Sequence, residues 1–222
     1  MIASPATVRR VASLAAGALL TSPVSATPTR DAFASIPNVT IAPYLVEGDD
    51  ALAVRRSIDA RRPTDAHDGT RVDAVSSWDM RWSWPRTRGG GCDLRRATIR
   101  YTATVRLPRL AGTARLTPAE RTAWDRYLAA LMVHEAGHVA YTYDRRSDVL
   151  AAIRSATCAT ADRAARAALA AIDAYHIAYD RETGHGATQG ASFPSPRAAG
   201  HRRHVAEITR TPPPPSDADT PQ

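Results

Sequence analysis

The sequence predicts an α+β fold, and three observations support this prediction. Residues 78–84 and 99–107 alternate apolar and polar side chains, which is the period of a half-buried strand. A Gly-rich segment separates them, so we expect the two strands to pair as an antiparallel hairpin. Residues 118–156 and 161–183 repeat apolar side chains at helical spacing. We therefore expect a small antiparallel sheet packed on a long helix, with a second, C-terminal helix closing the site.

The N-terminus has the pattern of an export signal. Arg9 and Arg10 precede an apolar run from Val11 to Leu20, and small residues follow up to position 26. We expect residues 1–26 to be a signal peptide and the protein to be secreted or periplasmic in a bacterium. The apolar run is too short to span a bilayer, so no stable membrane insertion is expected after cleavage. An uncleaved anchor is the alternative.

The rest of the chain divides by composition. Its 222 residues are 44% apolar, which suits one domain with unstructured ends. Residues 27–38 form a polar lead, and residues 39–195 form the predicted domain. Residues 196–222 are Pro-rich and poor in apolar side chains, which is typical of disorder.

The first part of the domain predicts a strand, a helix and a loop. Val39–Val46 is the strand, residues 50–61 are the helix with Asp49 or Asp50 near its cap, and residues 62–73 are loop-like. In the next strand Trp78, Trp82 and Trp84 share one face. Such a row could bind carbohydrate, but we expect it to belong to the core.

The long helix has a strong start signal in Thr117-Pro118-Ala119-Glu120. A Thr at the N-cap, a Pro at the first helical position and a Glu three residues after the cap all favour a helix beginning here. Downstream the helix contains His134-Glu135-Ala136-Gly137-His138. Both His lie on its apolar stripe, about 40° apart around the axis, so both can reach one metal ion.

This H-E-x-x-H spacing is that of zinc peptidases. The two imidazoles bind Zn²⁺ and the Glu is the general base. We therefore predict His134 and His138 as zinc ligands and Glu135 as the catalytic base, acting on a peptide or protein substrate. The alternative, two His that only fill a core, would leave Glu135 buried without a partner.

A third protein ligand is needed, and several residues are candidates. The second helix should end at Gly184, which leaves His185 on a turn between two glycines and free to approach the metal. We predict His185 as the ligand, with Asp180 or Thr183 orienting an imidazole. Asp180 is also the first alternative ligand, followed by Glu182 and His176. Asp144 would point about 120° away from His138 on a continuous helix and is rejected.

Several segments together resemble a known family: bacterial secreted proteins predicted to be zinc-dependent proteases of the zincin clan, with a domain otherwise of unknown function. The resemblance covers roughly residues 43–194. It rests on Tyr44-Leu45-Val46-Glu47-Gly48, Trp78 to Trp84, Gly91-Cys92, Leu107-Pro108, Trp124, His134 to His138, Tyr179-Asp180, His185-Gly186, Gly190-Ala191 and Phe193-Pro194. It implies a zincin-like fold and a zinc site, and it does not supply a substrate.

The two cysteines and the charge refine this picture. Cys92 and Cys158 are expected to pair in an oxidising compartment, closing a 66-residue span worth roughly 4 kcal/mol. The net charge of +7 rests on Arg alone. Because these Arg are scattered and lie in no nucleic-acid motif, we expect no nucleic-acid partner. The sequence leaves the oligomeric state open.

Two other functions stay open at this point. The first is a non-catalytic envelope module that zinc stabilises, in which four protein ligands would close the metal shell. The second is a zinc amidase that acts on cell-wall peptides. If catalysis does occur, Tyr179, Tyr175 or an Arg could stabilise the oxyanion.

Overall fold

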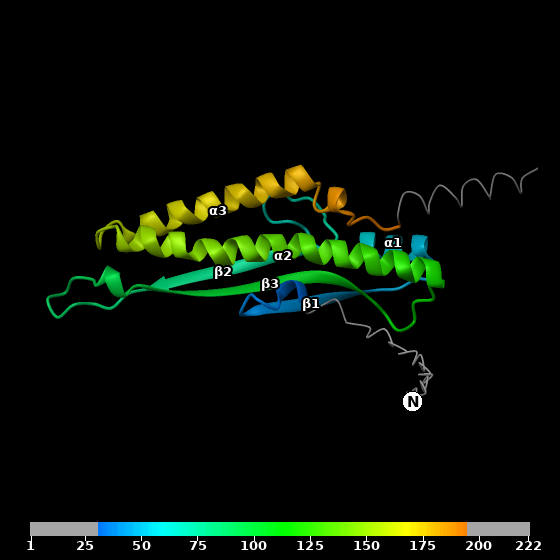
Figure 1. Ribbon diagram of the computed structural model, residues 1–222, viewed down its shortest axis with the longest axis horizontal. Helices are drawn as coiled ribbons and strands as arrows, with labels where there is room; N and C mark the ends of the chain where they lie inside the picture. The colour runs from blue at the N-terminus through cyan, green and yellow to red at the C-terminus, as the bar shows by residue number, and fades with distance from the viewer. Residues whose placement is uncertain (1–30, 195–222) are drawn as a thin grey trace, which may run out of the picture.

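The computed structural model describes residues 31–194, and Figure 1 shows their arrangement. The elements in chain order are η1 (Asp31–Phe33), β1 (Val39–Val46), α1 (Ala51–Arg61), β2 (Val75–Ser83), η2 (Leu94–Arg96), β3 (Thr98–Leu110), α2 (Pro118–Arg154), α3 (Ala161–Thr183) and η3 (Ala187–Gln189). The predicted signal peptide, residues 1–26, and the predicted tail, residues 196–222, lie outside the described residues. Within the described part, no helix combines the length and the apolar character needed to cross a membrane.

The α+β class is confirmed, but the purely antiparallel sheet is wrong. The three strands lie in the order β1-β3-β2. β2 and β3 form the predicted antiparallel pair, with Met80 opposite Tyr101. β1 instead runs parallel to β3, with Val39 opposite Ala103, so the sheet is mixed. Alternation along a strand fixes which face is buried but not which strand is its neighbour, and α1 with the following loop carries the chain across to the other edge.

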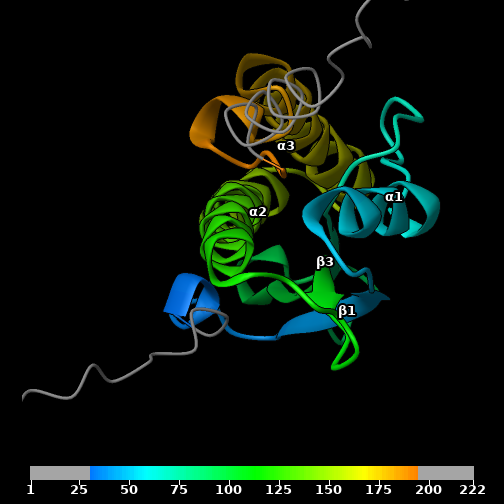
Figure 2. The same cartoon turned by 90° about the vertical axis from the view of Figure 1, so that its right-hand side faces the viewer.

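The helices form two layers over one face of the sheet. α2 lies along the sheet and α3 lies on the far side of α2, as both views show (Figures 1 and 2). α1 packs beside α2 over the end of β1 (Figure 2). The alternation of β3 is confirmed, because its core-facing residues are buried and its Arg and Thr residues are exposed on the opposite face. The Trp side chains of residues 78–84 pack against the core, as expected.

The predicted start of the long helix is confirmed in detail. Thr117 Oγ1 accepts a hydrogen bond from the main-chain N–H of Glu120, and Glu120 Oε2 accepts one from the N–H of Thr117 at 3.0 Å. The other carboxylate oxygen of Glu120 accepts from the N–H of Ala51 at 3.2 Å. One residue therefore caps α2 and also satisfies the first free N–H of α1.

The far end of the α2–α3 pair is tied to the sheet by the predicted disulfide between Cys92 and Cys158. Cys92 precedes η2 and β3, while Cys158 lies in the turn between the two helices. At the N-terminal side, Phe33 and Ile36 of the predicted polar lead are buried in the core. The part of the lead that the structure describes is therefore packed on the domain.

A partly buried ion pair fixes the chain just before β2. Asp73 receives two hydrogen bonds from Arg55 of α1, at 2.6 and 2.7 Å, and one from the hydroxyl of Tyr127 of α2 at 2.9 Å. The hydroxyl of Tyr44 of β1 donates to the main-chain oxygen of Asp73 at 2.7 Å. Burial alone would raise the pKa of Asp73, but the hydrogen bonds and charge of Arg55 outweigh it, so its pKa lies below its usual value.

We expect Asp73→Asn to lower the free energy of unfolding by about 2 kcal/mol at pH 7, because it removes a charge that pairs with the partly buried Arg55 and leaves this Arg only the more exposed Asp59. A carboxyl group whose pKa is lowered on folding stabilises the protein above its unfolded pKa of about 3.9, and this stability is lost as the pH falls through the folded pKa. The difference in the free energy of unfolding between the wild type and the variant should therefore reach its full size above about pH 5 and become smaller below about pH 4. Urea unfolding at a series of pH values measures it.

Asp59→Asn is the matched control. Asp59 also accepts a hydrogen bond from Arg55, at 2.8 Å, but its side chain is 47% exposed. Its loss should cost less than about 1 kcal/mol. Equal stability of the wild type and Asp73→Asn at pH 7 would contradict the account.

Candidate metal centre

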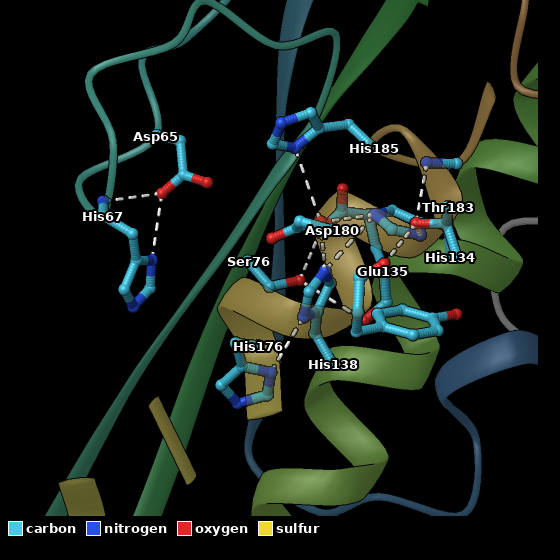
Figure 3. A network of polar contacts seen from close by, with 12 residues as sticks. Asp65, His67, Ser76, His134, Glu135, His138, His176, Asp180, Thr183 and His185 are labelled. Atoms are coloured by element: carbon cyan, nitrogen blue, oxygen red, sulfur yellow. Dashed lines mark hydrogen bonds and ion pairs between the residues drawn. The ribbon is translucent and has the colours of Figure 1, made fainter. Parts of the chain in front are cut away.

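Three atoms that could bind one metal ion meet where α2 contacts α3 (Figure 3). His134 Nε2 and His138 Nε2 of α2 are 3.3 Å apart. Asp180 Oδ1 of α3 lies 3.1 Å from the first and 3.0 Å from the second. Ligand atoms about 2.0–2.1 Å from a tetrahedral zinc ion are about 3.3 Å from one another. The triangle of these three atoms therefore has the size of one face of a zinc coordination tetrahedron.

The proton on His138 is placed by a chain of hydrogen bonds. Thr142 Oγ1 donates to the main-chain oxygen of His138 at 3.0 Å, because a carbonyl oxygen can only accept. Its own oxygen then accepts from His176 Nε2 at 2.8 Å. A neutral His176 with a proton on Nε2 has a lone pair on Nδ1, and this accepts from His138 Nδ1 at 2.9 Å. Neutral His138 therefore has its free lone pair on Nε2, the atom that faces Asp180.

Burial keeps His176 neutral. Desolvation, followed by the nearby His138, lowers the pKa of His176 to about 4. On sequence grounds His176 was a less favoured candidate ligand. Its ring instead lies between His138 and Thr142 and hydrogen-bonds with both.

His134 is oriented in the same way from the other side. Its Nδ1 lies 3.0 Å from Gln189 Oε1, an acceptor, so Nδ1 carries the proton and Nε2 has the free lone pair. Tyr179 stacks on its ring, with centroids 5.0 Å apart. Burial alone would lower the pKa of His134, but the contact with Asp180 outweighs it, so its pKa is raised. Burial would likewise raise the pKa of Asp180, yet its close contacts with His134 and His138 hold it well below its usual value.

The close contact of the two helices depends on Gly137. A Cβ at this position would lie 2.7 Å from the hydroxyl oxygen of Tyr179, well inside contact distance. The glycine inside the H-E-x-x-H segment thus lets Tyr179 sit against α2 and stack on His134. Gln189 also donates to the Tyr179 hydroxyl, at 3.0 Å.

Glu135 is buried and its side chain is held by β2. Ser76 Oγ donates to Glu135 Oε2 at 2.6 Å, across 59 residues of sequence. Burial raises the pKa of Glu135, although Ser76 and the two His of the motif oppose the shift. The carboxylate lies at the same pocket as the three ligand atoms, so it can act on a molecule bound beside them.

The structure brings most of the predicted site residues together and changes their order. Asp180, the alternative ligand, lies closest to the two His of the motif. His185 lies outside the triangle of His134, His138 and Asp180, with its Nδ1 3.4 Å from Asp180 Oδ1. Thr183 Oγ1 lies 3.5 Å from His134 Nδ1, where it can help to orient that ring as expected. Glu182 is exposed and lies outside the pocket lining.

Tyr175 and Tyr179, the residues considered for stabilising an oxyanion, do not line the pocket either. Three polar residues that line it were not predicted from the sequence: Ser76 at the start of β2, and Asp65 and His67 in the preceding loop. The alternation of side chains along the strand places Ser76 on the same face as Trp78. No pattern in the sequence, however, shows which face of the strand packs against α2.

All five His of the described residues line this one pocket: His67, His134, His138, His176 and His185. Three carboxylates line it as well, from Asp65, Glu135 and Asp180, whereas no Arg of the described residues does so. Although the chain has 29 Arg, the groups with charge or lone pairs at this pocket are thus mainly imidazoles and carboxylates. Such a donor set favours a cation such as Zn²⁺.

Residues 41–186 match the model of a family described as "Bacterial protein of unknown function (DUF922)". The chain belongs to this family. The match includes both helices of the candidate centre and ends immediately after His185. Searches of curated proteins and of solved structures found no match.

Thr142→Val should weaken zinc binding by about 10- to 100-fold, because it breaks the hydrogen bonds that orient His176 and, through it, His138. Thr142→Ser keeps the hydroxyl and should bind zinc as the wild type does. Competition with a chromophoric chelator measures the affinity. If valine and serine bind zinc equally tightly, the chain of hydrogen bonds plays no part in orienting the ligand.

Proposed function

We propose that this protein is an exported zinc-dependent peptidase, with His134, His138 and Asp180 as the zinc ligands. The support for this proposal is the position of three lone pairs. Two imidazole nitrogens and one carboxylate oxygen lie 3.0–3.3 Å apart. Hydrogen bonds at the far side of each ring place the imidazole protons away from the shared point. Electron pairs this close repel one another unless a cation or an extra proton lies between them, and a metal ion can bind all three at once.

A zinc ion in this position would polarise a peptide carbonyl and lower the pKa of an attacking water. The surrounding residues have distinct roles. Asp180 adds negative charge to the ligand set, while His176 and Gln189 hold the two imidazoles in place. Three protein ligands leave a fourth coordination position, which is the pattern of catalytic rather than structural zinc.

Glu135 is the general base of the proposal. Its raised pKa makes it a stronger base than an exposed Glu. It takes a proton from the attacking water and delivers it to the leaving amine. The hydrogen bond from Ser76 holds one oxygen of the carboxylate and leaves the other for proton transfer. Ser76 thus positions the base.

The place of β2 supports a peptide as the substrate. β2 is an edge strand of the sheet, and its residues Val75, Ser76 and Trp78 line the pocket. An extended peptide can pair with a free strand edge through main-chain hydrogen bonds. Binding there would bring a peptide bond alongside Glu135. This arrangement, together with the H-E-x-x-H helix, is the basis for the proposed zincin likeness.

Glu135→Gln should keep zinc and lower cleavage by at least about 100-fold, because the amide retains the shape and an acceptor for Ser76 but cannot take a proton. The readout is mass spectrometry of a mixed peptide library, with metal content measured on the same samples. Glu182→Gln on the exposed face of α3 is the control and should cleave as the wild type does. Equal cleavage by wild type and Glu135→Gln would rule out the proposed base.

A further inference from the structure

A second set of metal-binding side chains lies beside the first. Asp65, Asp180 and His185 each bring one ligand atom to within 4.8 Å of the others, and Asp180 is the member that this set shares with His134 and His138. The proposed peptidase site uses neither Asp65 nor His185. Their presence at the same pocket therefore needs its own explanation.

Asp65 is held rigidly although it lies in a loop. Its main-chain N–H donates to Thr70 at 2.8 Å, and its main-chain oxygen accepts from Gly69 at 3.0 Å. His67 contacts Oδ1 through both its main-chain N–H, at 2.8 Å, and its ring Nδ1, at 3.0 Å. Figure 3 shows the other carboxylate oxygen turned towards the side where His185 and Asp180 lie. Asp65 is only 6% exposed, so this carboxylate is fixed and largely removed from solvent.

His185 is placed by the turn that follows α3. It has a φ of 51°, which is uncommon for a residue with a side chain, and it follows Gly184 with a φ of 56°. Two successive left-handed residues bring the ring back over Asp180, with Nδ1 3.4 Å from Oδ1. On the other side of the ring, Nε2 faces Asp68 Oδ2 at 3.9 Å. A cation bound between Nδ1 and Asp180 would leave the ring proton on Nε2, on the side of Asp68.

The charges of the groups that line the pocket also favour the binding of more than one cation. Three carboxylates, from Asp65, Glu135 and Asp180, line the pocket with no Arg of the described residues among them. One divalent cation at the first triangle would compensate Asp180 and part of Glu135, but it would leave Asp65 largely buried with only the imidazoles of His67 and His185 near it. Buried carboxylates are stable when a cation or metal ion pairs with them.

We propose that this pocket holds a second divalent cation, bound by Asp65 and His185 and sharing Asp180 with the first. Mixed imidazole and carboxylate ligands suit Zn²⁺ and similar transition-metal ions. Two ions that share a carboxylate form a paired centre, which can hold both the attacking and the leaving group of one substrate. The inference rests on the first metal site of the proposed function for its shared ligand, but it does not depend on peptide cleavage.

The test is zinc stoichiometry. The full chain is stripped of metal, equilibrated with excess zinc alone and dialysed, and its metal content is then measured by mass spectrometry. The wild type should hold two zinc ions per chain. Asp65→Asn and His185→Gln should each hold one, because each removes a ligand of the second set only. Asp79→Asn, on the outer face of β2, is the control and should hold two.

The outcomes separate this proposal from the first. One zinc in the wild type that Asp65→Asn and His185→Gln keep and His138→Gln loses would overturn the second site and leave the first intact. One zinc that Asp65→Asn loses and His138→Gln keeps would overturn the first site, and with it the shared centre. No zinc in the wild type would overturn both. The wild-type count needs no variant, so the proposal can be refuted even if a variant fails to fold.

Discussion

Two imidazole nitrogens and a carboxylate oxygen lie within 3.3 Å of one another at the contact of α2 and α3, and much of the molecule is organised around this constraint. Without a cation these electron pairs would push the helices apart, unless extra protons were bound. Several contacts between uncharged groups nevertheless hold the two helices together at this point. Gly137 admits Tyr179, Tyr179 stacks on His134, and the neutral His176–Thr142 pair fixes His138. The fold thus provides the rigid scaffold that a preorganised metal site requires.

The rest of the fold keeps those contacts in place. The sheet gives α2 a buried face to pack on, and the Cys92–Cys158 disulfide ties the distant end of the helix pair to the sheet. The Asp73 ion pair joins α1, α2 and β1 immediately before β2 begins. Because Ser76 follows three residues later, this ion pair also sets where the partner of Glu135 lies. Stability and site geometry are therefore coupled through a short stretch of chain.

The sequence predicted the parts that follow from local rules. The capping residues Thr117 and Glu120 marked the start of α2, and Gly184 marked the end of α3. Helical spacing put His134 and His138 on one buried face. The choice between Asp180 and His185 was harder, because it depends on how α3 crosses α2. A His on a Gly-flanked turn looked more adaptable, yet Asp180, four residues after His176, lies on the same face of α3 and reaches α2 directly. The position of β1, the role of Ser76 and the importance of Asp65 depend on pairings between distant segments, which no local pattern encodes.

The central claim is that His134, His138 and Asp180 bind one zinc ion. Anomalous diffraction at the zinc absorption edge, on crystals of the zinc-loaded protein, tests it most directly. The account predicts an anomalous peak about 2.0–2.2 Å from His134 Nε2, His138 Nε2 and a carboxylate oxygen of Asp180. A map without a peak at this triangle, or a zinc ion bound there by His185 in place of Asp180, would contradict it.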